Sequence, residues 1–273
     1  MNLRRPWGLA RSCHPEPTVA VTLLITIMAL RSGRGPATVW VASAVLAGQL
    51  SVGWANDYLD RGLDVGRPDK PVAAGEVSPA AVRTAAVVAL VLAFLLSLVS
   101  GITAAAVHLV ALTLAHGYNL RLKRTVLSVG AYAVAFALAP AFVSLGARPP
   151  RLPPAWLVLA AALIGAGAHF TQTLADHDRD RDAGIRGLPQ RLGRRASVIA
   201  AGVLLAGAAL VATLGPGRPA LPGMGLLALC ALLVLGTVAT GLAGRYLASF
   251  RLTLAAAATA VSIFLVGSGS GLG

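Results

Sequence analysis

Long apolar runs recur along almost the whole chain, separated by short polar segments that carry most of the charge. A helix that crosses the hydrocarbon core of a bilayer needs about 20 mainly apolar residues. Only 12% of the 273 residues are charged, about half the roughly 25% of a soluble domain. The pattern disfavours a disordered chain or an ordinary soluble enzyme. It predicts an all-α fold, a multi-pass transmembrane helical bundle with about nine spans: 16–30, 36–55, 79–99, 101–120, 125–146, 153–175, 196–214, 220–242 and 247–268.

The first of these segments is short, and it follows Arg4 and Arg5 in the manner of a secretory signal peptide. Its apolar core, however, runs directly into Leu30-Arg31-Ser32 without a small-residue cleavage site. We therefore expect this segment to be a retained span.

The basic residues predict an orientation. If the N-terminus is cytoplasmic, eighteen of the 23 Lys and Arg residues lie on the cytoplasmic side and five on the other. Such a bias is typical of cytoplasmic loops of membrane proteins. We therefore expect a cell-membrane protein whose C-terminal residues 267–273 are outside. The net charge of +13 is then explained by topology, and no nucleic-acid partner is expected.

Nine of the ten acidic residues fall into two clusters, and only Glu16 lies elsewhere. The clusters follow the second and the sixth predicted span, so four spans separate them and both emerge on one face, which the charge bias makes cytoplasmic. Their members are Asp57, Asp60, Asp64, Asp69 and Glu76 in the first, and Asp176, Asp178, Asp180 and Asp182 in the second.

The two clusters share a spacing. Asn56, Asp60 and Asp64 are four residues apart and would share one face of a continuing helix. Gln172, Asp176 and Asp180 repeat this spacing 116 residues later. The echo indicates a weak internal repeat, with halves at about 1–124 and 125–273 of a single membrane domain, 1–273. Ligand sites often lie where such halves meet.

Like charges four residues apart destabilise a helix. Carboxylates placed on one helix face therefore suggest either neutralisation by neighbouring cations or a functional role. One reading is an exposed loop whose acids are neutralised by Arg61, Arg179 and Arg181. The reading we favour is binding of Mg²⁺, which prefers hard oxygen ligands and is often held by carboxylates together with phosphate oxygens. Two facing clusters could hold two ions bridged by one diphosphate.

Basic residues near the clusters fit a diphosphate. Lys123 follows Tyr118 at the end of the fourth predicted span, and Arg67 and Lys70 follow the first cluster. Cations beside a leaving diphosphate neutralise the charge that develops on it. Arg121, Arg194 and Arg195 are attributed to topology alone.

His169, Gln172 and Asp176 form a polar stripe on the sixth predicted span, pointing one way. Polar residues inside a membrane suggest function. Gln172 and His169 are therefore candidate substrate-binding residues. His169 could orient or deprotonate an acceptor, although a helix–helix hydrogen bond explains it equally well.

These residues together resemble the UbiA superfamily of intramembrane prenyltransferases. The resemblance lies in Asn56-Asp57-x-x-Asp60-x-x-x-Asp64 with the following Arg67-Pro68-Asp69-Lys70-Pro71, in Tyr118-x4-Lys123-Arg124, and in Asp176-x-Asp178-x-Asp180-Arg181 with the following Leu188-Pro189. It implies a nine-helix bundle around a central cavity open to the bilayer. There the Asp motifs would bind Mg²⁺ and an isoprenyl diphosphate. The resemblance implies metal or diphosphate contact for Asn56, Asp60, Asp64, Asp176 and Asp180, and diphosphate contact for Tyr118 and Lys123. His14, Asp178-Arg179 and Gly187 depart from what many members have.

The expected function is thus Mg²⁺-dependent transfer of an isoprenyl group from a prenyl diphosphate to an aromatic or lipophilic acceptor, through an allylic cation formed in the membrane. Asp60, Asp64, Asp176, Asp180 and Lys123 are the predicted catalytic residues. One alternative is a terpene cyclase of the same superfamily, which needs no acceptor. A more distant alternative is an ion or proton transporter, but a transporter would place its carboxylates near the bilayer midplane rather than beyond the helix ends.

Overall fold

The computed structural model describes residues 4–217 and 221–267. Within these ranges the chain forms helices joined by turns, with 3₁₀ turns at Gly35–Ala37 and Leu122–Arg124. The helices are α1 (Arg4–Ser12), α2 (Pro15–Arg31), α3 (Thr38–Asp60), α4 (Pro79–Leu98), α5 (Ile102–Leu120), α6 (Ser128–Leu145), α7 (Ala155–Gln172), α8 (His177–Asp182), α9 (Leu188–Leu192), α10 (Arg194–Leu214), α11 (Leu221–Leu242) and α12 (Tyr246–Gly267). The predicted all-α class is confirmed.

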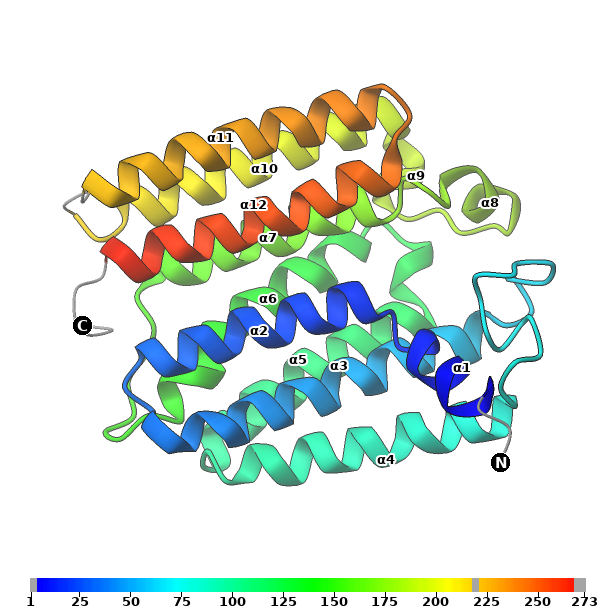
Figure 1. The fold of residues 1–273 in the computed structure, drawn as a ribbon, viewed down its shortest axis with the longest axis horizontal. Coiled ribbons are helices and arrows are strands. Elements are labelled where there is room, and N and C mark those ends of the chain that lie inside the picture. The colour runs from blue at the N-terminus through cyan, green and yellow to red at the C-terminus, as the bar shows by residue number, and fades with distance from the viewer. Residues whose placement is uncertain (1–3, 218–220, 268–273) are drawn as a thin grey trace.

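Each of the nine predicted ranges coincides with one long helix, α2 to α7 or α10 to α12. These helices run lengthwise, side by side, while the short helices α1, α8 and α9 gather at one end (Figure 1). We call this end, which carries Asp60 and Asp180, the Asp end. The layout is that of a membrane bundle with an additional layer of loops and short helices at one end.

Not every long helix would be identified as a span by itself. Seven pass a combined test of length and apolarity, and the bent pair of α1 and α2 raises the count to eight. The helix α5 is absent from these, because residues such as His108, His116 and Asn119 lower its hydropathy. Nine long helices are present among the described residues, and seven or eight of them have the length and apolarity of a membrane span.

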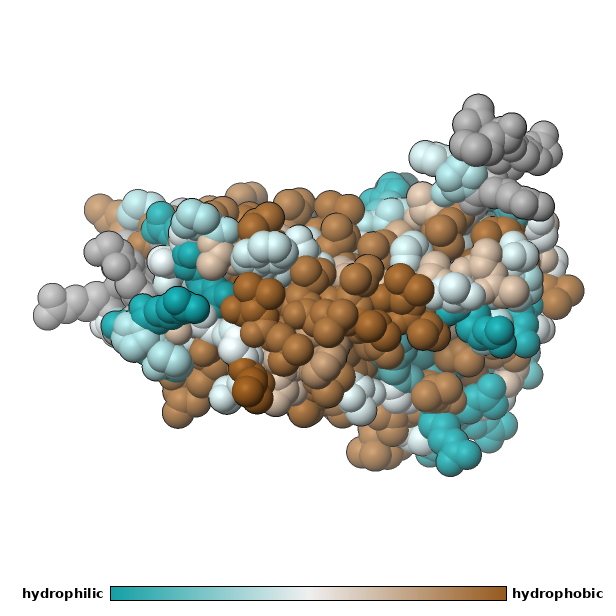
Figure 2. All heavy atoms as spheres, turned by 90° about the horizontal axis from the view of Figure 1, so that it is seen from below, coloured by the Kyte–Doolittle hydropathy of each residue, from teal (hydrophilic) through white to brown (hydrophobic). Residues whose placement is uncertain are grey.

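The outer surface of the bundle is apolar. Large aliphatic side chains are exposed along α4, among them Val87, Val91 and Leu95, each about half accessible. On the face seen in Figure 2, a broad apolar region covers the middle, and hydrophilic residues lie toward the two ends. A bilayer supplies the environment that such a surface requires.

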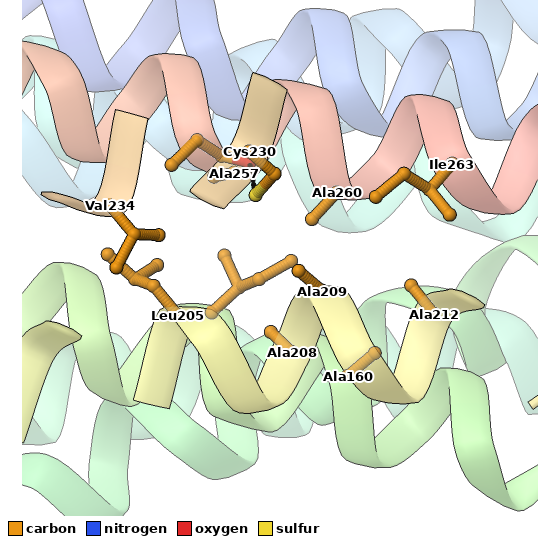
Figure 3. Close-up of a cluster of buried hydrophobic side chains, with 12 residues drawn as sticks. Ala160, Leu205, Ala208, Ala209, Ala212, Cys230, Val234, Ala257, Ala260 and Ile263 are labelled. Atoms are coloured by element: carbon orange, nitrogen blue, oxygen red, sulfur yellow. Dashed lines mark hydrogen bonds between the residues drawn. The ribbon is translucent and has the colours of Figure 1, made fainter. Parts of the chain in front are cut away.

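Small side chains let the helices approach closely. The largest buried cluster joins α7, α10, α11 and α12 and is built mostly from alanines such as Ala208, Ala209, Ala257 and Ala260 (Figure 3). In lipid, helix association depends on close packing and on small residues that allow it.

The break between α1 and α2 brings the N-terminal segment to the Asp end. The two helices meet at 66°, and His14 at the break adopts a left-handed conformation with φ 55°. Gly53 of α3 lies directly against this break, where a Cβ atom would stand 2.2 Å from the Cys13 carbonyl oxygen. Only glycine allows this approach, so Gly53 lets the break between α1 and α2 lie against α3.

The last helix leaves the Asp end. Tyr246, at the start of α12, lies under the guanidinium of Arg194, and α12 runs from there to the opposite end of the bundle (Figure 1). Its last residue, Gly267, is thus at the end opposite to α1. The prediction of an outside C-terminus concerns mainly residues 268–273, which lie outside the described residues. Arg218, one of the five basic residues assigned to the outside, also lies outside them.

Candidate active site

The first Asp cluster begins on the last turn of α3. The Asn56 amide donates to Asp60 Oδ2 at 2.9 Å and to Asn119 Oδ1 of α5 at 3.3 Å. The expectation that the helix continues to Asp64 is wrong, because α3 ends at Asp60. Asp64 nevertheless stays on the same side, since its backbone N–H donates to the Asp60 carbonyl at 2.9 Å and adds one further turn.

The second cluster lies where α7 gives way to α8. The helix α7 ends at Gln172, so Asp176 follows the helix instead of extending the predicted stripe. A backbone hydrogen bond of 2.8 Å from Asp180 to the Asp176 carbonyl keeps the four-residue spacing. The Asp180 carboxylate accepts from the Gln190 amide at 2.8 Å.

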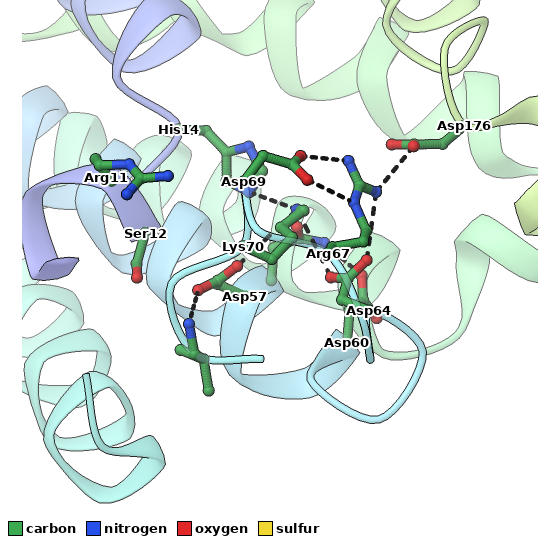
Figure 4. A network of polar contacts seen from close by, with 12 residues as sticks. Arg11, Ser12, His14, Asp57, Asp60, Asp64, Arg67, Asp69, Lys70 and Asp176 are labelled. Carbon is green, nitrogen blue, oxygen red and sulfur yellow. Dashed lines mark hydrogen bonds and ion pairs between the residues drawn. The ribbon is translucent and has the colours of Figure 1, made fainter. Parts of the chain in front are cut away.

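Arg67 joins the two clusters. Its Nη1 atom lies 2.8 Å from Asp176 Oδ1 and 3.4 Å from Asp64 Oδ1, while Nη2 pairs with Asp69 at 2.6 Å (Figure 4). The hydrogen bonds from Arg67 lower the pKa of the Asp69 carboxyl. Residues 109 positions apart in the chain are thus in direct contact, which confirms that both clusters emerge on one face.

Lys70 belongs to the same network but is tied to the loop. Its Nζ atom lies 3.7 Å from Asp64 Oδ2, 4.0 Å from Asp57 Oδ1 and 3.4 Å from the His14 ring. Asp57 is fully buried and also accepts from the Val72 backbone N–H at 3.3 Å. Asp57 therefore anchors the loop after α3 and points away from Asp60.

Lys123 forms an ion pair with Asp60 Oδ1. It is buried in the short 3₁₀ turn after α5, whereas Arg121, two residues earlier, is exposed. The difference in burial supports the separation made from the sequence between a lysine in the site and an arginine of the surface.

Three rings, from α5, α6 and α7, pack against one another. The His169 ring stacks on Tyr132 with centroids 4.5 Å apart, and the edge of Tyr118 meets His169 at 5.2 Å. The Tyr132 hydroxyl donates to Gln172 at 3.0 Å. His169 is fully buried, and neither of its ring nitrogens has a hydrogen-bond partner among the described residues. His169 and Gln172 thus share one neighbour, Tyr132.

Three residues of this site were not predicted from the sequence. Asn119 supports Asn56, Gln190 supports Asp180, and Tyr132 carries the ring cluster. Asn119 stands directly after Tyr118 and Gln190 directly after Leu188-Pro189, so both could have been suspected from their place in the motifs. Tyr132 lies inside an apolar run and has no such signal.

The donor set suits Mg²⁺, since carboxylate and amide oxygens are the ligands this ion takes. Asp64 Oδ2 is buried and accepts no hydrogen bond from the described residues, although the Lys70 ammonium lies 3.7 Å away, so this oxygen has room for a further ligand. In the described ranges no three acidic, His or Cys side chains surround a common point. Arg67 and Lys123 instead contact the carboxylates, so metal binding requires these cations to shift.

The burial of Asp180 beside another carboxylate predicts a pH dependence of stability. Burial, followed by the charge of Asp176, raises the pKa of Asp180 to about 6, against about 3.9 in an unfolded chain. The folded protein binds the extra proton between these values, so without Mg²⁺ its free energy of unfolding should fall as pH rises through about 6. Thermal unfolding in detergent with a chelator at pH 5 and pH 7 measures this.

The matched variants are Asp180→Asn and Asp182→Asn. Asp182 is exposed, so its variant should keep the difference between pH 5 and pH 7, and Asp180→Asn should reduce it. An undiminished difference in Asp180→Asn would contradict the assignment.

Comparison with known proteins places the chain in a family. The model of the UbiA prenyltransferase family matches residues 18–267. A digeranylgeranylglyceryl phosphate synthase of Natronomonas pharaonis is 32% identical over 257 residues, covering 91% of this chain and 89% of the relative. A 4-hydroxybenzoate octaprenyltransferase of an Enterobacter species is 32% identical over 166 residues, 59% of this chain and 57% of the relative.

Solved structures share the fold. A UbiA homologue from Aeropyrum pernix K1 matches with a TM-score of 0.75 and 21% identity, over 92% of this chain and 98% of that one. A UbiA homologue from Archaeoglobus fulgidus bound to GPP and Mg²⁺ matches with a TM-score of 0.65 and 17% identity, over 94% and 99%. The chain belongs to the UbiA prenyltransferase family.

Proposed function

We propose that this protein transfers an isoprenyl group from a prenyl diphosphate to a lipophilic acceptor, with two Mg²⁺ ions bound at the Asp end. The observation that carries the proposal is the contact of two distant Asp clusters through Arg67, with Lys123 paired to Asp60. A relative of the same fold was solved with GPP and Mg²⁺, which supports the same donor class here.

The Mg²⁺ ligands are Asn56, Asp60, Asp64, Asp176 and Asp180. When bound, the ions supply positive charge that holds the diphosphate and favours its departure. Lys123, Arg67 and Lys70 add cationic donors on the same side, and Tyr118 contacts the diphosphate from α5. Each cation now paired with a carboxylate would exchange that partner for a phosphate oxygen.

The chemistry breaks one carbon–oxygen bond and forms one bond to the acceptor. The electron pair of the allylic carbon–oxygen bond leaves with the diphosphate. The acceptor atom then supplies the pair for the new bond, and its proton passes to the released diphosphate or to a nearby base. Lipid and buried helices exclude water, which protects the cation from hydrolysis.

The ring cluster lies on the acceptor side of this arrangement. His169 has two unpartnered ring nitrogens in a buried position, and buried polar groups normally have partners. A bound substrate hydroxyl would supply one. Gln172 would orient it together with Tyr132, whose hydroxyl it already binds. These roles make His169 and Gln172 substrate-binding residues.

The acceptor we place first is a lipid alcohol with a phosphate, because the relative that covers 91% of this chain is named for a glyceryl phosphate product. An aromatic acceptor is the second candidate, since a shorter match is a 4-hydroxybenzoate octaprenyltransferase. A terpene cyclase acting on the diphosphate alone is the remaining alternative within this site.

The Asp end faces the cytoplasm in this proposal, because eighteen of the 23 basic residues are assigned to that side. The N-terminal helix α1 lies at the Asp end (Figure 1), so a cytoplasmic N-terminus would put the Asp clusters on the cytoplasmic side as well. A reporter fused to the N-terminus that is active only outside the cytoplasm would contradict the orientation.

The decisive experiment supplies purified protein in detergent with Mg²⁺ and prenyl diphosphates of several lengths, with and without alkylglyceryl phosphate or 4-hydroxybenzoate. We expect a prenylated acceptor, detected by mass spectrometry, and no product when a chelator replaces Mg²⁺. A cyclised hydrocarbon formed without acceptor would establish the cyclase alternative instead. Diphosphate release without any organic product other than prenyl alcohol would contradict both.

A further inference from the structure

The break between α1 and α2 has an unfavourable backbone conformation at His14. With φ 55° and ψ 71°, His14 is the one non-glycine residue with a positive φ in the described ranges. A side chain disfavours this left-handed region, and the following Pro15 opposes a continuous helix through this residue. Glycine would make the same turn more easily. A strained residue beside a reaction site suggests that its side chain has a role there.

The ring of His14 contacts a cation of the site. Its Nε2 atom lies 3.4 Å from the Lys70 ammonium (Figure 4), closer than the carboxylate oxygens of Asp64 at 3.7 Å and Asp57 at 4.0 Å. An ammonium group can only donate hydrogen bonds, so the ring nitrogen is the acceptor and the ring is neutral. A neutral acceptor orients Lys70 without cancelling its charge, which stays available for a phosphate oxygen.

The loop that carries Lys70 is held against α1 on both sides of this residue. Arg11 pairs with Glu76 at 2.9 Å and donates to the Pro68 carbonyl at 3.3 Å. The backbone at Lys70 is therefore restrained, and the position of its ammonium depends on the torsions of its flexible stem. A hydrogen bond to His14 restricts these torsions before the substrate arrives, which reduces the entropy that binding costs.

The break itself is fixed relative to α3. Thr18 Oγ1 donates to the Cys13 carbonyl at 2.8 Å, and the Trp54 indole of α3 donates to the Leu9 carbonyl of α1 at 2.8 Å. His14 thus stands at a defined position beside the helix that carries Asp60. A side chain that is to orient another group needs such support.

We propose that His14 is a positioning residue, which holds the Lys70 ammonium by a hydrogen bond so that Lys70 can bind the donor diphosphate. The inference rests on the proposed function, which assigns Lys70 to the diphosphate. His14 acts through Lys70 and does not touch the substrate. With His14 and Asp57 behind it, the ammonium would leave only Asp64 to meet a phosphate oxygen.

Variants at His14 separate the ring from the backbone. His14→Gly removes the ring and relieves the strained conformation, whereas His14→Asn also tolerates this conformation but keeps an acceptor oxygen. We expect His14→Gly to raise KM for the prenyl diphosphate about tenfold, with a smaller effect on kcat and a thermal midpoint close to that of the wild type. His14→Asn should restore part of the donor affinity.

Thr18→Val is the matched control, because it removes a hydrogen bond that supports the break and leaves the ring of His14 in place. It should lower the thermal midpoint and keep the donor KM of the wild type. Equal rises in donor KM for Thr18→Val and His14→Gly would overturn the proposal in favour of a purely structural role of the break.

A double-mutant cycle with Lys70→Met tests whether His14 acts through Lys70. Binding of inorganic diphosphate in the presence of Mg²⁺, measured by calorimetry without acceptor, is the readout. We expect the double variant His14→Gly/Lys70→Met to bind no more weakly than Lys70→Met alone.

Additive losses in this cycle would overturn the proposal, because they would mean that His14 contacts the diphosphate directly. Unchanged binding in His14→Gly would refute the positioning role and leave the donor site intact. Absence of binding in the wild type would refute the donor site itself, and the positioning role with it.

Discussion

Replacing Asp60 or Asp176 with alanine should reduce turnover by at least about 10³-fold while the protein remains folded. Both carboxylates are predicted Mg²⁺ ligands, and each lies on one side of the Arg67 contact that joins the clusters. Loss of either removes an oxygen ligand that the other side chains cannot replace. Asp60→Ala also leaves the buried Lys123 ammonium without its carboxylate partner, so its thermal midpoint should fall, and turnover is compared at a temperature at which each variant is folded. Steady-state turnover at saturating Mg²⁺ and thermal unfolding measure the two effects.

Asp57→Ala and Glu16→Ala are the controls. Asp57 is adjacent to the site but anchors the loop through Val72 and Lys70, so its loss should lower the thermal midpoint while the Mg²⁺ concentration for half-maximal activity stays the same. Glu16 pairs at the surface with Arg251 at 2.6 Å, a contact worth at most about 1 kcal/mol. Near wild-type turnover in Asp60→Ala or Asp176→Ala would refute the metal assignment.

Lys123→Met should lower kcat by about 10²–10³. The ammonium group lies in the site, paired with Asp60 and buried in the turn after α5. Negative charge grows on the diphosphate as its bond to carbon breaks, so a cation there stabilises the transition state more than the bound substrate. Single-turnover rates of diphosphate release isolate this step. The KM for the acceptor should change little, because Lys123 is paired with Asp60, a carboxylate that we assign to the metal and the donor diphosphate.

Arg121→Met removes the same charge from the same turn. Arg121 is exposed and is not among the site contacts, so the rate should stay within about twofold of wild type. If both substitutions have the same small effect, the basic residues after α5 serve membrane orientation alone, and Lys123 has no part in the reaction. A large effect of Arg121→Met alone would show that the two roles were assigned the wrong way round.

The fold class was predictable because apolar run length is a local property of the sequence. Each predicted range coincides with a long helix, since a bilayer leaves an apolar segment few alternatives to a helix. The positions at which two helices end were predicted wrongly. Helical periodicity carried α3 past Asp60 and α7 past Gln172, but both helices stop there, and backbone hydrogen bonds in the following turns preserve the spacing instead.

The sequence by itself determined the all-α membrane fold, the two Asp clusters and their emergence on one face, because these follow from composition, spacing and the number of spans. Only the tertiary structure decided which side chains meet. The Arg67–Asp176 contact, the pairing of Lys123 with Asp60 and the support of Asp180 by Gln190 depend on how helices far apart in the chain pack. The position of the short helix α9 depends on it too, because hydrogen bonds from α9 to α6 and from α10 to α9 hold it in place. A linear pattern records the period of each helix but not the distance between two of them.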